Sequence, residues 1–374
     1  MNTNYRPTWA EINLANLAFN YRRLKRLAGK NVKMLAAVKA NAYGHGMIEV
    51  SRTLERCGVN YFGVASVDEA VQLRQAGITS RILVLGAVIS REEVRRAAEL
   101  DLTLTVTDYR AAMLVNRCAG AGRKLDVHIK IDTGMGRLGI WHEEALPVII
   151  RITRLPGVNI EGIYTHCPSA DTDRAFTRKQ LTVFNSIINR LREQNIYIPV
   201  THAANSSALC RLPGADFTMV RPGLMLYGMY PHRNLKKKIE LKPVLSFKTR
   251  IVFLKKARAG RSISYGRTYI TNKNSLIATI PVGYADGYCR ALSNRAYVLV
   301  NGARCPVIGR VCMDQALIDV TSCRKAAVGD IAVLIGRQGV QAVSAETLAD
   351  LCSTIPYEIT CRISSRVPRM FKNY

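Results

Sequence analysis

The chain has 374 residues, of which 48% are hydrophobic and 22% are charged, as in a soluble globular protein with one large domain and one smaller domain. Its 54 Lys and Arg outnumber its 27 Asp and Glu and give a formal net charge of +27. These basic residues are spread along the chain, and their densest clusters contain no interleaved aromatic residues. We therefore do not expect a nucleic-acid partner. No apolar run approaches the ~20 residues of a membrane-spanning helix, and the N-terminus lacks the apolar core of a signal peptide, so we expect a cytoplasmic protein with no membrane partner. The ten cysteines form no C-x-x-C pair and no Cys/His cluster, which argues against a disulfide framework and a structural metal.

The first motif follows the apolar run 33–38, which predicts a short buried strand, and precedes a helical pattern at 47–56. It reads Val38-Lys39-Ala40-Asn41-Ala42-Tyr43-Gly44-His45-Gly46. A lysine at the end of a strand can project its amine into a cleft, and glycine and asparagine allow the backbone to turn tightly beside it. Lys39 is therefore a candidate to hold a carbonyl cofactor as a Schiff base, which requires a partly desolvated amine. On this motif alone, a surface lysine beside a loop is an equal alternative.

From residue 33 to about residue 225, short apolar runs alternate with longer helical patterns. The predicted strands are 33–38, 61–64, 81–85, 102–106, 125–131, 159–164, 198–203 and 217–220. The predicted helices between them include 66–76, 91–99, 108–119, 143–154 and 173–194. Eight strand–helix units in ~200 residues predict an α/β fold, a (β/α)8 TIM-type barrel within residues 1–240. A doubly wound open sheet is the alternative, but the G-x-G-x-x-G turn that usually follows its first strand is absent from the sequence.

The pattern changes at a basic, irregular segment near residues 231–242. Short strand-like runs follow at 244–253, 276–281, 297–300, 305–308, 316–320 and 331–335. Turn sequences such as Asn301-Gly302 and Gly329-Asp330 separate some of these runs, which is typical of hairpins. We therefore expect a second, mostly antiparallel β domain over residues 241–374.

Candidate functional residues follow five of the predicted barrel strands. In chain order they are Lys39, Arg137, His166, Asn205-Ser206 and Arg221. In such a barrel the working residues lie just past the C-terminal ends of the strands, and phosphate groups often bind after strands seven and eight. Taken singly, each residue has a structural explanation, such as a rim histidine, a surface arginine or a helix cap. Their common placement at one end of the barrel predicts a site there.

The motif around Lys39 resembles the pyridoxal-phosphate attachment motif of bacterial alanine racemases. The resemblance runs over nearly the whole chain and takes in residues 131–139, Met219-Val220-Arg221-Pro222-Gly223, Ser264-Tyr265-Gly266, 282–288, 309–314 and Pro356-Tyr357-Glu358, in the family's order. It implies a pyridoxal 5'-phosphate cofactor and a homodimer with shared active sites. It also implies interconversion of L- and D-alanine, which supplies D-alanine for peptidoglycan. Cys167-Pro168 after His166 and the basic surface depart from the family pattern.

The resemblance implies two catalytic bases. Lys39 would hold the cofactor and act on one face of the bound substrate, and Tyr265 of a partner subunit would act on the opposite face. Inverting a stereocentre is most direct when one group removes the proton and another delivers one from across the plane. A neutral phenol is a weak base, so nearby positive charge must favour the phenolate of Tyr265.

The resemblance also implies how cofactor and substrate are held. Arg221 would hydrogen-bond the ring nitrogen with His166 behind it, and Arg137 would contact the ring's phenolic oxygen and the substrate carboxylate. The expected phosphate contacts are Tyr43, Ser206, Gly223, Leu224 and Tyr357, and Asn205 is a further expected cofactor-binding residue. The remaining expectations are Met313 for the substrate carboxylate, Asp171, Tyr284 and Arg310 at the entrance to the site, and Lys130 as a lysine that can be carbamylated and pair with Arg137.

Two other functions stay open at this point. A racemase of serine or lysine would differ only in its pocket, and such discrimination is worth only ~1–3 kcal/mol. Tyr357, which would crowd the side-chain end of the substrate, favours a small one. A non-enzymatic carrier of the cofactor would need no opposing base, so Tyr265 and the segment around Met313 argue against it.

Overall fold

The computed structural model describes residues 5–373 except 121, 213, 216 and 324, and the chain divides into two compact units. The barrel unit consists of Leu17–Ala42 and Met47–Leu241. The β unit consists of Met1–Asn16, Tyr43–Gly46 and Lys242–Tyr374. This division differs from the expected 1–240 and 241–374 because two early segments cluster with the C-terminal part of the chain.

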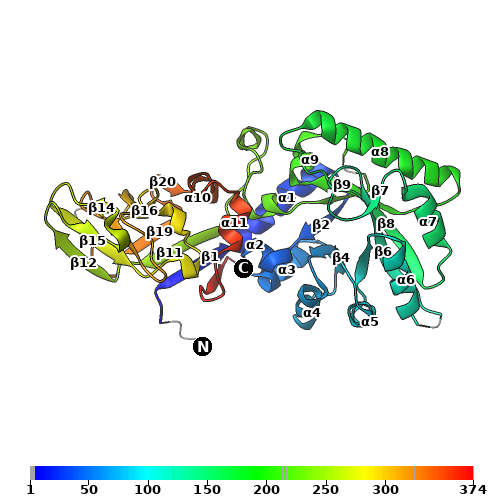
Figure 1. Ribbon diagram of the computed structural model, residues 1–374, viewed down its shortest axis with the longest axis horizontal. Coiled ribbons are helices and arrows are strands. Elements are labelled where there is room, and N and C mark those ends of the chain that lie inside the picture. The colour runs from blue at the N-terminus through cyan, green and yellow to red at the C-terminus, as the bar shows by residue number, and fades with distance from the viewer. Residues whose placement is uncertain (1–4, 121, 213, 216, 324, 374) are drawn as a thin grey trace. The chain divides into compact units, whose positions relative to one another are not determined.

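Eight parallel strands close the barrel unit into a ring, which confirms the predicted (β/α)8 barrel (Figure 1). They are β2 (Lys33–Ala37), β3 (Tyr61–Val64), β4 (Arg81–Ala87), β5 (Thr103–Val106), β6 (Leu125–Asp132), β8 (Val158–Tyr164), β9 (Val200–Asn205) and β10 (Met219–Arg221). The ring closes because β10 pairs with β2 and β5 pairs with β6. A further strand that the sequence pattern did not predict, β7 (Ile140–Trp141), pairs with the end of β6.

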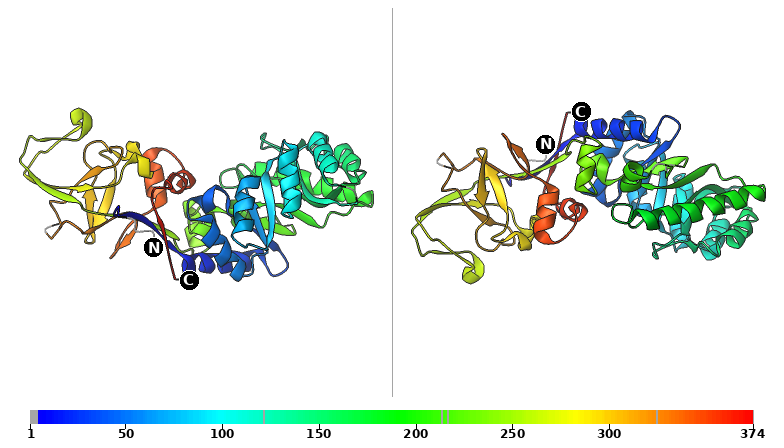
Figure 2. Two further views of the ribbon diagram at one scale, coloured as in Figure 1. Left: turned by 90° about the horizontal axis from the view of Figure 1, so that it is seen from below. Right: turned by 90° about the horizontal axis from the view of Figure 1, so that it is seen from above.

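Helices of the barrel unit surround its strands in the views of Figures 1 and 2. They are α1 (Leu14–Ala28), α2 (Lys39–Tyr43), α3 (Met47–Arg56), α4 (Val67–Gln75), α5 (Arg91–Glu99), α6 (Tyr109–Cys118), α7 (Ala145–Thr153), α8 (Arg174–Glu193) and α9 (Ser206–Arg211), with short 3-10 turns η1 (Leu224–Tyr227) and η2 (Arg233–Lys237). Local sequence decides where several of them begin. At α5, Ser90 Oγ accepts a hydrogen bond from the Glu93 amide at 3.1 Å, and the Glu93 carboxylate accepts one from the Ser90 amide at 3.0 Å. Such caps fix the loops that join strand ends to helices.

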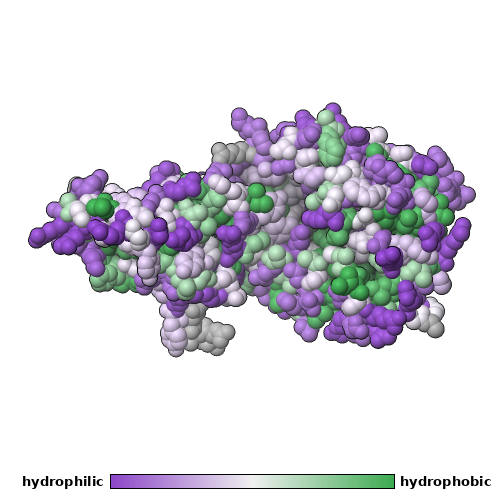
Figure 3. Space-filling model, viewed as in Figure 1, coloured by the Kyte–Doolittle hydropathy of each residue, from purple (hydrophilic) through white to green (hydrophobic). Residues whose placement is uncertain are grey.

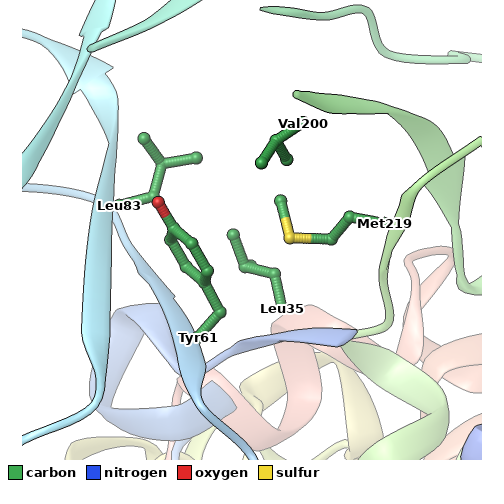
Figure 4. Packing of buried hydrophobic residues seen from close by; sticks show 5 residues of the cluster. All are labelled: Leu35, Tyr61, Leu83, Val200 and Met219. Carbon is green, nitrogen blue, oxygen red and sulfur yellow. The ribbon is translucent and has the colours of Figure 1, made fainter. Parts of the chain in front are cut away.

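Apolar side chains from five barrel strands pack against one another in the view of Figure 4. They are Leu35, Tyr61, Leu83, Val200 and Met219, each at most 2% exposed. Burying a side chain of this size contributes roughly 1.5–3 kcal/mol. Because this part of the barrel is filled by packing, a functional site must lie toward one end of it.

The β unit is mostly antiparallel, as predicted. Its larger sheet has the order β17-β16-β19-β11-β1-β21, with β20 beside β19, and the only parallel pair among its described strands is β1 with β21. The strands are β1 (Thr8–Asn13), β11 (Leu245–Arg250), β16 (Tyr297–Val300), β17 (Ala303–Pro306), β19 (Ile331–Gln338), β20 (Gln341–Val343) and β21 (Arg369–Lys372). Two smaller sheets contain β12 (Phe253–Ala257), β15 (Ser275–Ile280) and β18 (Ala316–Asp319), and β13 (Ser262–Ile263) with β14 (Tyr269–Ile270). The unit's helices are α10 (Ala345–Cys352) and α11 (Pro356–Cys361), and its 3-10 turns are η3 (Tyr265–Arg267), η4 (Tyr284–Asp286) and η5 (Arg290–Leu292).

A buried ion pair explains why the N-terminal segment belongs to the β unit. The fully buried carboxylate of Asp286 accepts two hydrogen bonds from the Arg6 guanidinium at 2.7 Å and one from the Gly283 amide at 2.9 Å. Arg366 Nε lies 3.1 Å from the same carboxylate. Breaking such a buried pair leaves an uncompensated charge, so these contacts fix the segment that leads into β1.

In the described part of the chain, no helix is both long and apolar enough to cross a membrane. Within the same residues, no group of three or more His, Cys, Asp or Glu side chains could hold a metal ion. The face drawn in Figure 3 carries hydrophilic residues interspersed with smaller hydrophobic groups, as is usual for protein surfaces.

Candidate active site

Lys39 begins an unusual turn directly after β2. The backbone of Ala40, Asn41 and Ala42 lies in the left-handed helical region, with φ of 53°, 52° and 53°. For residues other than glycine this conformation costs roughly 1–2 kcal/mol each. Such strain persists only where surrounding contacts determine the conformation, and it is typical of functional sites.

Two side-chain contacts hold this turn in place. The Glu69 carboxylate, on α4, accepts a hydrogen bond from the Ala40 amide at 2.7 Å. The Asn41 Oδ1 atom accepts one from the Met47 amide at 2.8 Å and thereby joins the turn to the start of α3. The partly buried side chain of Lys39 therefore starts from a fixed backbone position at the C-terminal end of a barrel strand.

Arg221 ends the last barrel strand and is only 6% exposed. Its guanidinium donates to the carbonyls of Thr165 and Ala203 at 2.8 and 3.1 Å, and it lies 2.7 Å from His202 Nδ1 and 3.3 Å from His166 Nδ1. Burial lowers the pKa of Arg221 to about 10, which still leaves it charged at neutral pH. None of these partners in the described chain is a carboxylate, so the charge is balanced by dipoles and neutral rings.

Two neutral histidines flank this arginine. Burial, followed by repulsion from Arg221, holds the pKa of His166 well below its ordinary value. The same two causes, in the same order, lower the pKa of the fully buried His202. A neutral imidazole has one acceptor nitrogen, so each ring can accept a hydrogen bond from the guanidinium. The predicted contact between Arg221 and His166 is present in the structure, and His202 adds a shorter one.

Lys130 lies on β6 and is 5% exposed. Burial, and then the charges of Arg221 and Arg137, lower the pKa of its amine well below the ordinary value, although Asp132 acts in the opposite direction. The Lys130 Nζ atom lies 4.6 Å from the centre of the Tyr164 ring, and the Arg221 Cζ atom lies 5.2 Å from it. The Tyr164 ring thus contacts both the charged guanidinium of Arg221 and the Lys130 amine, whose protonated form that guanidinium disfavours.

Asp132, the last residue of β6, organises the loop that carries Arg137. Its Oδ1 atom accepts hydrogen bonds from the amides of Gly134 and Met135, both at 2.8 Å. Its Oδ2 atom accepts from the amides of Gly136 and Arg137 at 2.8 and 3.2 Å. One carboxylate therefore satisfies four successive loop amides and fixes the backbone of Arg137 beside the rim.

The loops after β9 and β10 are joined by hydroxyl and amide groups. Asn205 caps α9, with its Oδ1 atom accepting from the amides of Ser207 and Ala208 at 3.0 Å. The Ser206 hydroxyl accepts from the Gly223 amide at 3.0 Å. The buried Ser207 hydroxyl makes no hydrogen bond to the described chain, and Leu224 continues from Gly223 into η1.

The Cys167-Pro168 departure from the family pattern does not loosen the loop after β8. Cys167 is 1% exposed, and its carbonyl accepts a hydrogen bond from Asn205 Nδ2 at 3.0 Å. In the same loop region, the Asp171 carbonyl accepts a hydrogen bond from Arg211. Asp171 itself is partly buried and lies in the barrel unit, as do all the predicted residues that follow barrel strands.

The other predicted residues lie in the β unit. The rings of Tyr43 and Tyr357 pack with their centres 5.8 Å apart, and burial, then the neighbouring Tyr357, raises the pKa of Tyr43. The main chain beside Tyr43 is closely packed, because a Cβ atom on Gly44, whose φ is +84°, would lie 2.1 Å from the Thr360 carbonyl oxygen.

Tyr265 and Met313 are exposed, at 71% and 54%, and Tyr284 is also exposed. The guanidinium of Arg310 lies against the main chain of Gly266, the residue after Tyr265, since a Cβ atom on Gly266 would be 3.0 Å from Arg310 Cζ. The carbonyl of Met313 accepts a hydrogen bond from the Ala285 amide at 3.0 Å, next to Tyr284 in the chain.

Two family models match the chain: the alanine racemase N-terminal domain at residues 12–231 and the alanine racemase C-terminal domain at residues 244–371. The alanine racemase of Halothermothrix orenii is 48% identical over 98% of this chain and 97% of the relative, and that of Carboxydothermus hydrogenoformans is 45% identical over 98% and 100%. The chain belongs to the alanine racemase family. A solved alanine racemase from Bacillus anthracis with bound L-Ala-P superposes with a TM-score of 0.92 at 37% identity, covering 99% of this chain and 96% of that one.

Alanine racemases are pyridoxal-phosphate-dependent isomerases, and the rim of this barrel fits that cofactor. Arg221 and its neighbours supply positive charge without a carboxylate among the arginine's partners in the described chain, which suits an anionic, electron-rich group. The buried hydroxyl of Ser207, which has no partner in the described residues, and the Ser206 hydroxyl supply polar groups for phosphate oxygens. Lys39 supplies the amine.

Several residues of this alanine racemase site were not predicted from the sequence. They are Asp132, which holds the Arg137 loop, the aromatic ring of Tyr164, and the buried polar groups His128, Glu161 and His202. A signal was present, because His128 and His202 interrupt apolar runs that predict buried strands. Buried polar side chains require partners, so such interruptions indicate a polar network inside the barrel.

Proposed function

We propose that the protein interconverts L- and D-alanine by a two-base proton transfer that uses pyridoxal 5'-phosphate. The observation that carries the proposal is the strained, fixed turn that presents Lys39 at the same barrel rim as Arg221. The Arg221 side chain is buried, and its partners among the described residues include no carboxylate. When bound, the cofactor supplies a conjugated ring that accepts the electron pair left behind when the substrate's α-proton is removed. The chain's own side chains then decide where that proton goes.

Lys39 and Tyr265 carry the two proton transfers in this proposal. Lys39 removes or delivers the α-proton on one face of the substrate, and Tyr265 does so on the other. A tyrosine that is 71% exposed on one chain is available to the active site of a second copy. The protein is accordingly a homodimer in which each active site borrows Tyr265 of the partner subunit.

Arg221 controls side reactions in this proposal. Its guanidinium would donate a hydrogen bond to the cofactor's ring nitrogen but would not readily give up a proton, because it stays charged at neutral pH. With that nitrogen unprotonated, the bound cofactor would withdraw electrons from the substrate less strongly, which would favour return of the α-proton over transamination.

Arg137 and Lys130 hold the substrate end. Arg137 contacts the substrate carboxylate and the ring's phenolic oxygen, a task that suits a guanidinium on a backbone fixed by Asp132. The neutral amine of Lys130 reacts with carbon dioxide, forming an N–C bond and releasing one proton to solvent, to give a carbamate; burial beside two arginines favours the neutral amine. The negative carbamate then pairs with Arg137 and holds its side chain in position.

The remaining roles complete the site. The phosphate is held by Tyr43, Ser206, Gly223, Leu224 and Tyr357, Asn205 is a further cofactor-binding residue, and the Met313 backbone amide contacts the substrate carboxylate. Asp171, Tyr284 and Arg310 lie at the substrate entrance, and the product D-alanine enters peptidoglycan synthesis from the cytoplasm. The choice of alanine over a longer substrate rests on Tyr357, which would crowd the side-chain end of the substrate and packs against Tyr43 with ring centres 5.8 Å apart.

The test combines spectroscopy with isotope exchange. The purified protein should show the visible absorbance of bound cofactor, which Lys39→Ala should abolish. Tyr265→Phe should keep that absorbance but lose at least roughly a hundredfold in racemisation while still exchanging the α-hydrogen of one enantiomer in deuterated water. Tyr197→Phe, at another exposed tyrosine, is the matched control and should behave as wild type. Full activity of Tyr265→Phe in both directions, or a preference for lysine over alanine, contradicts the proposal.

A further inference from the structure

A chain of hydrogen bonds runs from Arg221 into the interior of the barrel. The Arg221 guanidinium lies 2.7 Å from His202 Nδ1, and His202 Nε2 lies 2.7 Å from His128 Nδ1. His128 Nε2 in turn lies 3.3 Å from Oε2 of Glu161 on β8. Both histidines are fully buried, and the Glu161 side chain is 11% exposed. These four side chains form what we call the barrel relay.

The two ends of the barrel relay fix the position of every proton in it. An arginine can only donate, so His202 Nδ1 must be an acceptor. Glu161 can only accept, because hydrogen bonds from His128 and Tyr61 and the charge of Arg81 outweigh the effect of burial and lower its pKa to about 2. Both histidines are therefore neutral, with their single proton on Nε2, and all donors point toward the carboxylate.

The space for this arrangement is built into the backbone. A Cβ atom on Gly162 would lie 2.6 Å from the His128 ring, so a glycine is needed there for the imidazole to reach both partners. Glu161 has two further partners, since the Tyr61 hydroxyl, which lies 3.3 Å from His128 Nε2, donates to the same Oε2 atom at 2.7 Å and Arg81 pairs with Oε1. Glu161 is thus held in place independently of the histidines.

We propose that Glu161 is a positioning residue for racemisation, acting through His128 and His202 to set the orientation and donor strength of Arg221. The inference rests on the proposed contact between Arg221 and the cofactor's ring nitrogen. A carboxylate that accepts from one imidazole makes the other nitrogen of that ring a better acceptor, and the effect passes along the chain. Arg221, which has no carboxylate partner of its own in the described residues, thereby shares the countercharge of Glu161 and donates less strongly through its remaining N–H groups.

The substitution that tests the barrel relay is Glu161→Gln, which keeps the shape and removes the charge. In the holoenzyme we expect kcat to fall by roughly five- to twentyfold, which is the change in rate expected from the loss of one buried hydrogen bond. KM for alanine should change by less than about twofold. The control is Glu99→Gln, because Glu99 also pairs with an arginine, Arg96, at 2.8 Å, but has no contact with either histidine among the described residues. It should leave kcat and KM unchanged.

A measurement on the wild-type holoenzyme keeps the inference testable even if that variant folds poorly. Nitrogen-15 NMR should find His128 and His202 neutral, each protonated at Nε2 near pH 7. A proton on Nδ1 of either ring, a doubly protonated ring, or a Glu161→Gln holoenzyme with unchanged kcat would overturn the inference. A wild-type protein with these tautomers but no alanine racemisation would instead overturn the proposed function, so the two failures can be told apart.

Discussion

Replacing Asp132 by asparagine tests how the Arg137 loop is held. The wild-type carboxylate accepts four amide hydrogen bonds, two on each oxygen, at 2.8 to 3.2 Å. In Asp132→Asn one oxygen becomes an NH2 group, which faces two N–H donors and can accept from neither. The variant therefore loses two charge-assisted hydrogen bonds while the size of the side chain stays the same.

The magnitude follows from that count. A hydrogen bond to a charged group contributes roughly 1.5–3 kcal/mol, so closing the loop as in wild type would cost about 3–6 kcal/mol more. The loop can open without unfolding the rest of the barrel, so we expect the free energy of global unfolding to fall by only about 1–2 kcal/mol. An open loop moves the backbone of Arg137, and a displacement of about 1 Å in a positioning group can cost roughly a hundredfold in kcat/KM.

Two measurements check this expectation. Steady-state kinetics should show kcat/KM for alanine reduced by roughly a hundredfold, and hydrogen exchange should show lost protection at the amides of residues 134–137. Asp126→Asn, at the other end of the same strand, is the control, because its pairing with the half-exposed Arg81 is worth less than about 1 kcal/mol. A wild-type kcat/KM in Asp132→Asn, with the loop amides still protected, would refute the reasoning.

Two further predictions concern the β unit. Gly44→Ala should destabilise the protein by roughly 3 kcal/mol or more, because the new Cβ would lie 2.1 Å from the Thr360 carbonyl oxygen. The control Gly58→Ala, at a φ of +95° and with no atom within 4 Å of the new Cβ, should cost only about 1 kcal/mol. Equal losses in the free energy of unfolding, measured with urea, would contradict this expectation. Burial acts to raise the pKa of Glu11, but hydrogen bonds from Lys248 and two other side chains lower it from 4.5 to about 2. Because the folded-state pKa is lowered, this stabilisation is present above pH 4.5 and is lost as the pH falls toward 2, so Glu11→Gln should be about 1–2 kcal/mol less stable at pH 7 and equal to wild type near pH 2.

The barrel was predictable because buried parallel strands are nearly continuous apolar runs bounded by turn residues. Each of the eight predicted strands lies within two residues of an observed one. The place of Thr8–Asn13 was not predictable in this way. Its partners, β11 and β21, come more than two hundred residues later in the chain, and no local pattern specifies a pairing at that distance.

The candidate site shows the same limit. The motif around Lys39 indicated a tight turn, but Ala40 and Ala42 have no intrinsic preference for the left-handed conformation that they adopt. That conformation depends on contacts such as the one from Glu69, which only the folded barrel brings close. The identity of His202 likewise indicates a buried polar group, while its tautomer depends on what the rest of the barrel places on either side of it.

The charges at the rim explain why an acceptor as remote as Glu161 can affect Arg221. Arg221 and Arg137 disfavour the protonated form of Lys130, and the nearby carboxylate of Asp132 accepts hydrogen bonds from four backbone amides. A rim with this surplus of positive charge stabilises an anionic occupant, and any group that binds only the folded barrel also stabilises it against unfolding. Because no carboxylate of the described residues bonds to Arg221, the field at its guanidinium is set by polarisable neutral rings and by the carboxylate that orients them. The charge of Glu161 therefore polarises the rings of His128 and His202 and, through them, affects the Arg221 guanidinium. Both rings are buried, so solvent screens this effect little.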